Sequence, residues 1–514
     1  GTSSPSTPLG ASPSTGSGQV VSDSRTASSP IKDDPVSSPV GDLFSVPARP
    51  KNQKLARDLK ALNALHKKEG SDAVTARVLT HPGLARKISR LIRTLEREDE
   101  KEGYDIDVRW REEFKQRALA QAVGKIEDRD IFILQMEYAF SMEFLNHFKE
   151  HLMKAFHYSE AKATHETGEL VKTQMAGGLG SFKPDLVHGL YRVLEKFWGG
   201  QEANDRLYVM SILYSGAVKG QGETDPRILE TAVQSLQHVA TYQDIEVNMN
   251  HVNKVDVAIY RDPYAQPQEY WIYCPQVFHE TYPGNSNDDF RAVQTLVYRK
   301  AVLRFIKDLA AQGRLKDKLL FSTSELNTTL VVPAVVKDEY KHDPVFADTL
   351  VHHYNHTIVP AGMPHYNHYM FDPLRIADEF RFIIHDGIVD LVKLTGSVSD
   401  FLTGCSTHHT KVFAKEIYME FPHKIVEDDL FGNSEGSDIE RWQGIRVQEL
   451  IEKYRHMLGN PSTAAELFFL LDNNVEFKMA FAQELLAIKK VQKQEFIDAL
   501  FSGTFGALDV TKEE

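Results

Sequence analysis

The chain has 514 residues, of which 42% are hydrophobic and 25% charged, the balance of a folded globular protein with room for two or three domains. Its 59 Lys and Arg stand against 72 Asp and Glu, and a formal net charge of −13 argues against a nucleic-acid-binding surface, which needs an excess of positive charge. Two cysteines, Cys274 and Cys405, are too few for a disulfide framework, so we expect a reducing, cytoplasmic compartment, and no apolar run is long enough to span a membrane.

Residues 1–50 differ in composition from the rest of the chain. Thirty of them are Ser, Thr, Gly or Pro and few are apolar, so this segment cannot bury enough surface to offset its ordering entropy. We expect a disordered tail, a linker rather than a targeting peptide, because its aspartates are unusual in transit peptides. No methionine precedes Met136, so the chain is expected to be part of a longer protein.

Residues 51–128 carry apolar side chains at helical spacing, as in Leu55, Leu59 and Leu62, with charged residues between them. This pattern predicts an all-helical N-terminal layer.

From residue 129 to about 485, short apolar runs such as IFIL and YVMSILY alternate with longer amphipathic segments. Such alternation predicts an α/β domain with a Rossmann-like, largely parallel sheet. Two segments with period-two character, 255–260 and 269–274, predict a hairpin that belongs to this sheet. Helices are expected at about 184–197, 290–311, 376–396 and 476–501.

A glycine-rich string, Ala-Gly-Gly-Leu-Gly-Ser at 176–181, precedes Pro184, a residue well suited to a first helical position. One interpretation is a loop in which Gly177, Gly178 and Gly180 let backbone N–H groups bind an anion at a helix N-terminus. The other is a tight turn whose glycines only relieve steric crowding. The string matches neither the Walker pattern nor the dinucleotide fingerprint, so it does not specify a nucleotide phosphate.

Histidines gather near the end of a predicted strand, at His352, His353, His356, His365 and His368. Their spacing allows a zinc site, but prolines and a glycine break any helix here and no carboxylate lies between them. A second interpretation is a ligand-binding loop at the carboxyl end of a strand, lined by neutral hydrogen-bonding groups that suit sugar hydroxyls. Histidines without any ligand are the third.

Taken together, several strings resemble the glycogen, starch and maltodextrin phosphorylase family, in collinear order over most of residues 131–505. The matching strings are Ala139-Phe-Ser-Met-Glu-Phe144, the glycine string, YVMSILYSGAVKGQG at 208–222, Tyr282-Pro-Gly284 with Phe290-Arg291 and Gln294, Tyr354-Asn-His-Thr-Ile-Val-Pro-Ala-Gly362, and Thr403-Gly404 with His409, Phe421-Pro422 and Trp442. The resemblance implies the N-terminal half of a two-domain glycosyltransferase of the B type. It also implies an enzyme in which orthophosphate cleaves the terminal α-1,4 glucosyl unit of a glucan to give glucose 1-phosphate.

The resemblance also implies roles for particular residues. His356, with Asn355 and Thr357, would hold the glucosyl ring, and the glycine string would bind phosphate. Thr323-Ser-Glu-Leu-Asn327 departs from the family pattern, because it leaves Glu325 as a candidate catalytic carboxylate beside His356 and places Asn327 where a histidine is expected. Glu435 stands where the family has a neutral amide, and it would repel phosphate unless protonated or paired.

The family's pyridoxal phosphate is bound by a lysine of a C-terminal domain, and residues 486–514 resemble the connection into that domain. We therefore expect no covalently bound cofactor on this chain and no turnover by it alone. Expected partners are an α-glucan and orthophosphate, with no nucleic acid, membrane or metal, and the resemblance implies a homodimer. Two alternatives stay open: a non-catalytic glucan-binding relative, and a transferase of related architecture that uses a nucleotide sugar.

Overall fold

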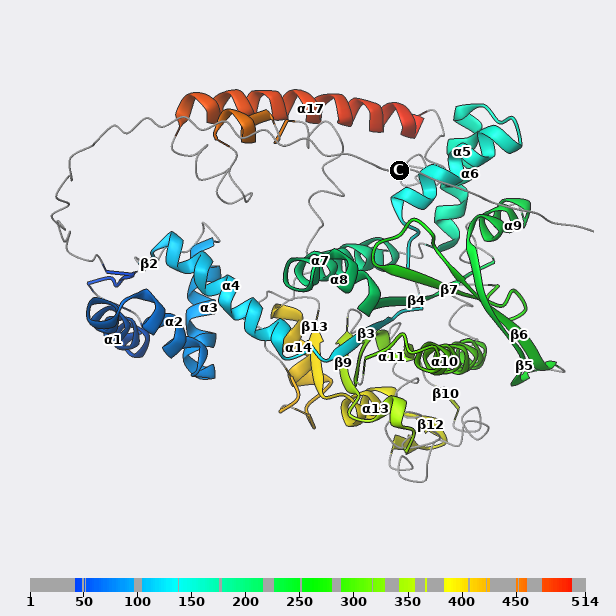
Figure 1. Ribbon diagram of the computed structural model, residues 1–514, viewed down its shortest axis with the longest axis horizontal. Coiled ribbons are helices and arrows are strands. Elements are labelled where there is room, and N and C mark those ends of the chain that lie inside the picture. Colours follow the sequence, from blue (N-terminus) through cyan, green and yellow to red (C-terminus); the bar gives the residue numbers. More distant parts are fainter. Residues whose placement is uncertain are drawn as a thin grey trace, which may run out of the picture.

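The computed structural model describes residues 42–48, 50, 52–96, 104–136, 138–174, 178–215, 226–249, 252–279, 288–316, 318–328, 342–355, 366–367, 383–404, 407–421, 423–425, 450–451, 453–459 and 474–501. Its elements form a helical N-terminal layer, a sheet domain with helices on both faces, and a long C-terminal helix (Figure 1).

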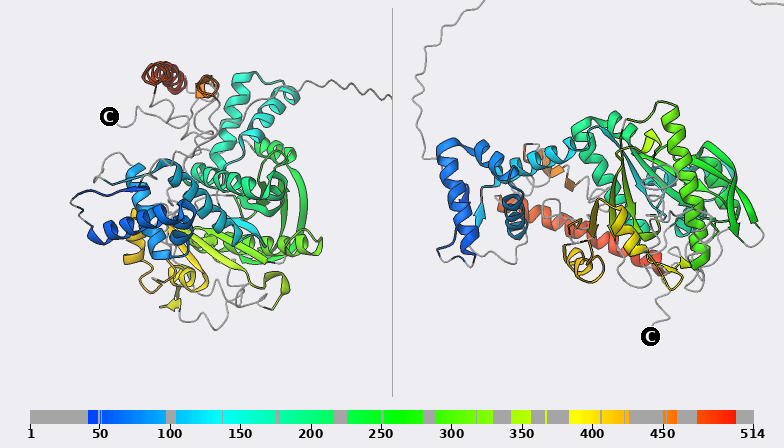
Figure 2. Two further views of the ribbon diagram at one scale, coloured as in Figure 1. Left: turned by 60° about the vertical axis from the view of Figure 1, so that its left-hand side comes forward. Right: turned by 90° about the horizontal axis from the view of Figure 1, so that it is seen from below.

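The N-terminal layer is helical, as predicted, and lies beside the sheet domain (Figures 1 and 2). Its helices are α1 (Gln53–Glu69), α2 (Ser71–Leu79), α3 (Pro82–Glu96) and α4 (Val108–Gly124), with a short antiparallel pair of strands, β1 (Phe44–Ser45) and β2 (Asp105–Ile106). The layer has an apolar core of its own, in which Trp110 stacks on Phe114 and donates to the hydroxyl of Thr75 over 3.0 Å. Leu43 and Phe44 are buried in this core, although the sequence assigned them to the tail.

The central sheet has eight strands in the order β13-β9-β8-β3-β4-β7-β6-β5. The strands are β3 (Arg129–Leu134), β4 (Leu207–Leu213), β5 (Gln237–Met249), β6 (Val252–Arg261), β7 (Gln268–Tyr273), β8 (Lys318–Ser324), β9 (Leu350–Asn355) and β13 (Phe401–Gly404). The strands from β13 to β7 are parallel, β6 alone runs in the opposite direction, and β5 pairs antiparallel with β6 and so runs in the direction of the parallel strands. The parallel strands therefore have the order 3-2-1-4-5-6 of a Rossmann-type sheet, which confirms the predicted α/β fold class.

Helices cover both faces of this sheet, so its central strands read as continuous apolar runs. One face packs against α10 (Asp288–Ala311) and α13 (Leu391–Val398). The other packs against α5 (Met142–Ala155), α6 (Glu160–Gln174), α7 (Gly178–Trp198) and α9 (Pro226–Ser235). The remaining elements are α8 (Gly200–Arg206), α11 (Glu325–Thr328), the 3-10 turn Pro344–Phe346, α14 (Thr407–Glu416) and a small sheet of β10 (Tyr366–Asn367), β11 (Ile384–His385) and β12 (Ile388–Val389).

The structure contains the predicted hairpin but not all of the helix predicted across residues 376–396. The predicted hairpin is confirmed, because β6 and β7 pair antiparallel, and β5 extends it by a further strand. The helix expected across 376–396 is wrong in its described part, since β11 and β12 form a hairpin there and α13 begins only at Leu391. Asp386 and Gly387 both have positive φ, of 50° and 79°, which a tight turn permits and a helix does not.

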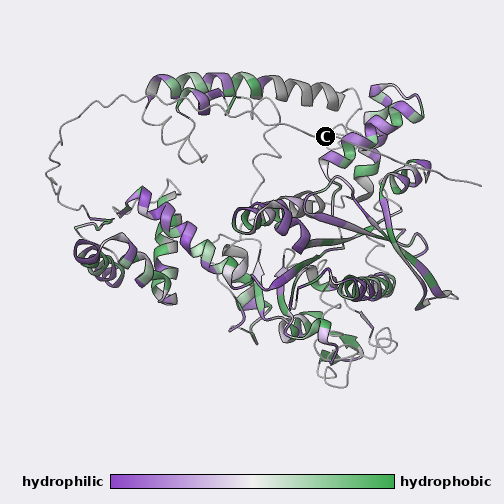
Figure 3. Ribbon diagram, in the orientation of Figure 1, coloured by the Kyte–Doolittle hydropathy of each residue, from purple (hydrophilic) through white to green (hydrophobic). Residues whose placement is uncertain are grey.

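The C-terminal helix α17 (Val475–Phe501) is present as predicted and runs along one side of the molecule (Figure 1). Phe477 and Phe481 pack on Tyr454, and this small cluster is separate from the sheet core. Apolar and polar residues are both spread along the described part of the helix (Figure 3). Among the described helices, none combines the length and apolar character that a membrane crossing needs.

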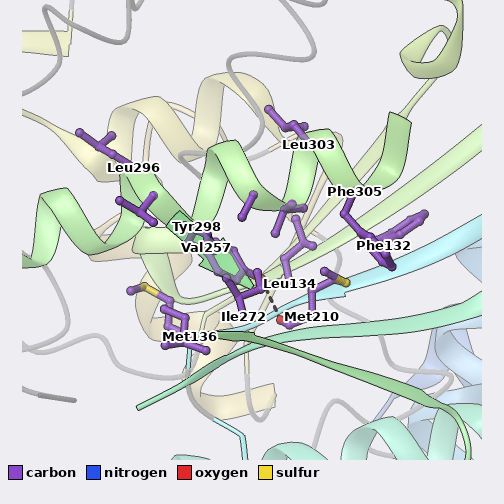
Figure 4. Packing of buried hydrophobic residues seen from close by; sticks show 14 of the residues in the cluster. Phe132, Leu134, Met136, Met210, Val257, Ile272, Leu296, Tyr298, Leu303 and Phe305 are labelled. Atoms are coloured by element: carbon purple, nitrogen blue, oxygen red, sulfur yellow. Dashed lines mark hydrogen bonds between the residues drawn. The ribbon is translucent and has the colours of Figure 1, made fainter. Parts of the chain in front are cut away.

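The core beneath α10 contains one polar group that ties the helix to the sheet (Figure 4). Tyr298 is fully buried, and its hydroxyl donates to the carbonyl of Met210 over 2.8 Å and accepts from the backbone N–H of Gln135 over 3.1 Å. These backbone groups belong to neighbouring strands and also bond to each other, the N–H of Gln135 donating to the carbonyl of Met210 over 3.0 Å. The hydroxyl therefore reinforces an existing bond between β3 and β4.

Replacing Tyr298 by Phe should lower the free energy of unfolding by about 1–2 kcal/mol, because it removes two buried hydrogen bonds while the ring is kept and the two backbone groups stay bonded to each other. Chemical denaturation monitored by circular dichroism would measure the change. Tyr264→Phe, at an exposed tyrosine, is the matched control and should change the midpoint little. An unfolding midpoint equal to that of the wild type would show that the hydroxyl does not tie the strands.

Candidate functional site

The strand order identifies one place where a ligand crevice is expected. The chain builds outward from β3 through β4 to β7, then returns to β8 on the other side of β3 and continues to β9 and β13. The connections at the carboxyl ends of β3 and β8 therefore lead to opposite sides, and ligands of open α/β sheets bind at such a switch point. The residues that follow β3, β8 and β9 thus define the candidate site.

Three buried polar atoms lie at this edge without a hydrogen-bond partner: Gln135 Oε1, Ser324 Oγ and Asn355 Oδ1. Gln135 directly follows β3, Ser324 ends β8 and Asn355 ends β9, and their exposures are 1%, 4% and 1%. A buried acceptor without a donor costs about 1–3 kcal/mol, so such groups are rare unless a ligand or water completes them. Three of them on adjacent strands indicate a site that binds a ligand with hydrogen-bond donors.

An arginine is held by Asn327, which follows β8 at the same edge. With its amide oriented to suit its neighbours, Asn327 accepts from Nε and Nη2 of Arg291, each over 2.9 Å, and donates to the hydroxyl of Tyr366. Asn327 is 2% exposed and Tyr366 fully buried, so this network is rigid. It places the positive charge of Arg291, at the start of α10, toward the carboxyl edge.

The two described histidines of the predicted cluster are hydrogen-bonded inside the sheet. His352 Nδ1 lies 3.0 Å from Ser322 Oγ and its Nε2 lies 2.7 Å from Thr403 Oγ1. His353 is fully buried, with Nδ1 2.9 Å from the hydroxyl of Thr323. Burial lowers the pKa of His352 to about 4, and burial together with His352 lowers the pKa of His353 to about 3. Both rings are therefore neutral at pH 7.

The structure brings together part of the predicted site. Asn355 and Asn327 lie at the carboxyl edge, and Glu325 begins α11 at the same edge, directly after β8. His356, Thr357, Gly177 and Glu435 lie outside the described residues. No group of three or more His, Cys, Asp or Glu side chains placed to bind a metal occurs within the described ranges.

The sequence predicted that the glycine string is a loop and that a helix begins at about Pro184, and this prediction is wrong. Helix α7 begins at Gly178, so Gly178 and Gly180 belong to its first turn and Pro184 lies inside the helix. Because Pro184 removes only one backbone hydrogen bond near the helix start, the helix continues through it. The N–H groups of the first turn, including those of both glycines, have no partner within the helix.

The end of α7 shows which edge its beginning faces. Trp198, its last residue, lies under the guanidinium of Arg206, whose carbon is 3.7 Å from the ring centre, at the edge where β4 begins. A helix of 21 residues spans about 31 Å, so its N-terminus points toward the carboxyl edge of the sheet. The glycines are therefore directed to the side on which Asn355 lies.

Sequence reasoning did not assign a role to Gln135, Ser324, Arg291 or Tyr366. Gln135 could have been found from the sequence, because it is the first polar residue after a buried apolar run. Ser324 could have been found in the same way, because it ends a predicted strand. Arg291 was part of a matching string but its contact with Asn327 joins residues 36 positions apart. Such a contact has no local pattern.

No family model and no curated protein matches the chain. Among solved structures, it is similar to the catalytic domain of starch synthase IV from Arabidopsis thaliana bound to ADP and acarbose, with 13% sequence identity and a TM-score of 0.41. The match covers 65% of this chain and 60% of that one, so the chain spans less than two thirds of its neighbour. A likeness of this size says nothing about what the chain binds.

The pH dependence of the free energy of unfolding tests whether His353 is neutral in the folded chain. Its pKa, about 3 in the folded chain, lies below the ordinary value of 6.5, so from pH 6.5 downward the unfolded chain takes up a proton that the folded chain does not. Between pH 7 and pH 5 this should remove about 2 kcal/mol of stability. Urea unfolding at the two pH values would measure the loss.

In His353→Gln, which keeps a neutral polar side chain, the loss between pH 7 and pH 5 should be smaller by about 2 kcal/mol. His385→Gln, at an exposed histidine, is the control and should show the wild-type loss. Equal losses in the wild type and His353→Gln would contradict a neutral, buried His353.

Proposed function

We propose that the chain binds the terminal glucosyl unit of an α-1,4-glucan at the carboxyl edge of its sheet, as the N-terminal half of a two-domain glycosyltransferase. The observation that carries this proposal is the set of unpartnered acceptors, Gln135 Oε1, Ser324 Oγ and Asn355 Oδ1. Amide oxygens accept hydrogen bonds and carry no charge. The amide oxygens of Gln135 and Asn355 suit sugar hydroxyls, which donate, and do not suit phosphate, which mainly accepts, whereas the hydroxyl of Ser324 can donate or accept.

Phosphate would bind elsewhere at the same edge. Arg291 supplies a guanidinium that Asn327 already orients, and the first turn of α7 supplies backbone N–H groups and the positive end of a helix dipole. Anion donors and sugar acceptors on different elements would let a sugar and a phosphate lie side by side. That arrangement supports phosphorolysis as the reaction, which agrees with the family resemblance.

In this proposal His356 and Thr357, which directly follow Asn355, contact the glucosyl ring, and Glu325 at the start of α11 provides a carboxylate near the reacting carbon. Asn327 acts by positioning Arg291, because both ends of its amide are engaged. Gly177, which directly precedes α7 in the sequence, would offer a further backbone N–H to the phosphate, and Glu435 would lower phosphate affinity unless protonated or paired.

The reaction transfers a glucosyl unit through a transition state with oxocarbenium character, which an adjacent anion and fixed dipoles stabilise. Pyridoxal phosphate, placed by the resemblance on a second domain, supplies an acidic phosphate group to that reaction when it is bound. The residues of this chain bind and orient the sugar and exclude water, which is positioning rather than proton transfer.

Two other functions fit the same sugar site. A non-catalytic relative would bind glucan without turning it over, and a nucleotide-sugar transferase would take its donor from the second domain. Incubating the complete protein with maltoheptaose and orthophosphate separates them. Release of glucose 1-phosphate supports phosphorolysis, transfer from a nucleotide sugar without phosphate supports the second transferase, and binding without either reaction supports the non-catalytic relative.

Asn355→Ala should weaken maltoheptaose binding at least about tenfold, since losing one hydrogen bond to a buried group is worth about 1–3 kcal/mol. Isothermal titration calorimetry would measure the affinity. Gln243→Ala, at an exposed amide of β5, the outermost strand at the opposite end of the sheet from β9, is the control and should bind like the wild type. Unchanged affinity in a folded Asn355→Ala protein would refute sugar binding at this edge.

A further inference from the structure

A cavity of about 660 Å³ opens at the opposite, amino edge of the sheet. Its walls come from the first residues of β3, the end of α7, helix α8 and the loop between α10 and β8. Asp130 lines it near the start of β3, whereas Gln135 of the candidate site follows the end of the same strand. Five residues of extended chain separate the two by about 17 Å, so this cavity is distinct from the carboxyl-edge site.

The cavity contains a buried acceptor without a donor. Asp130 is fully buried, and its Oδ2 accepts from the backbone N–H of Lys316. Its Oδ1 has no hydrogen-bond partner, and the nearest cationic atom, Nε of Arg206, is 3.9 Å away. Burial raises the pKa of this carboxyl group to about 6, which leaves it mostly ionised at neutral pH. A group that donates to Oδ1 from the cavity would complete the site.

The nearby arginine holds the walls together, and its Nε, which also has no hydrogen-bond partner, is too far from Oδ1 to donate to it. Arg206 donates from Nη2 to the carbonyls of Glu127 and Arg129, each over 2.6 Å, and from Nη1 to Glu202 over 3.0 Å. Its guanidinium also covers one face of Trp198 at 3.7 Å. These contacts fix α8 and the end of α7 against the start of β3, so the cavity is preformed.

The charges on the walls balance. The acidic side chains are Asp130, Glu202 and Asp205, and the basic ones are Arg206, Arg314 and Lys316. An anion or a cation would therefore meet both attraction and repulsion. A neutral ligand whose groups both donate and accept would be satisfied by walls of this kind.

We propose that this cavity binds a saccharide, a neutral polyhydroxylated ligand, with one hydroxyl donating to Asp130 Oδ1 and the sugar ring against the indole of Trp198. Hydroxyls donate to carboxylates and accept from Arg314 and Lys316, and the indole supplies apolar surface for the C–H face of a sugar. The volume lies within the range of about 300–1,000 Å³ that is usual for small-molecule sites. The assignment is independent of the proposed function, since it uses no residue of the carboxyl edge.

Calorimetric titration with maltotriose tests the proposal on the full chain. Asp130→Asn keeps an oxygen for the N–H of Lys316 but turns an N–H₂ donor toward the cavity, so it should weaken binding at this site at least about tenfold and leave the carboxyl-edge site unchanged. Asn355→Ala should have the reverse effect. Asp128→Asn, at an exposed neighbour outside the cavity that pairs with Lys318, is the matched control and should bind like the wild type.

If Asp130→Asn does not fold, the exposed pair Gln201→Ala with Asp205→Ala on α8 replaces it, with the same expected loss. Maltotriose binding that Asn355→Ala abolishes completely, and that Asp130→Asn does not change, would overturn the cavity proposal while supporting the proposed function. Binding that Asp130→Asn weakens and Asn355→Ala does not would support the cavity and count against the carboxyl-edge site. No binding at millimolar maltotriose would overturn both.

Discussion

The parallel arrangement of β13, β9, β8, β3, β4 and β7 is the constraint on which the other features depend. Parallel strands end at one edge, and helices cover both faces, so the polar residues that follow the strands gather along that edge. The reversal between β3 and β8 then opens a place where a ligand can reach the backbone. Tyr298 reinforces this edge by bonding backbone groups of two neighbouring strands.

The two edges of the sheet differ in their electrostatics. At the carboxyl edge the unpartnered groups are neutral, and the guanidinium of Arg291 is held by the amide of Asn327. At the amino edge, charges of both signs surround a buried carboxylate, and Arg206 is committed to backbone carbonyls. Both edges favour ligands that donate hydrogen bonds, and each does so through different atoms.

The longest apolar runs in the sequence correctly predicted buried strands and helices. Buried strands β3 and β4 and the long helix α10 have unbroken apolar runs or stripes, and all are present. Strand β5 was missed because bulges interrupt its pairing with β6 and much of it is exposed, so its apolar alternation is weak. The start of α7 was misplaced because Pro184 usually marks a first turn, whereas here the helix begins before it.

The sequence by itself determined the α/β class and the helical N-terminal layer, since these depend on periodicity and on neighbours along the chain. Only the tertiary structure decided which strands adjoin, that Asn327 holds Arg291, and that a cavity opens beside Asp130. Those features join residues tens to hundreds of positions apart. Their energies depend on burial and on distances between side chains, which no local pattern records.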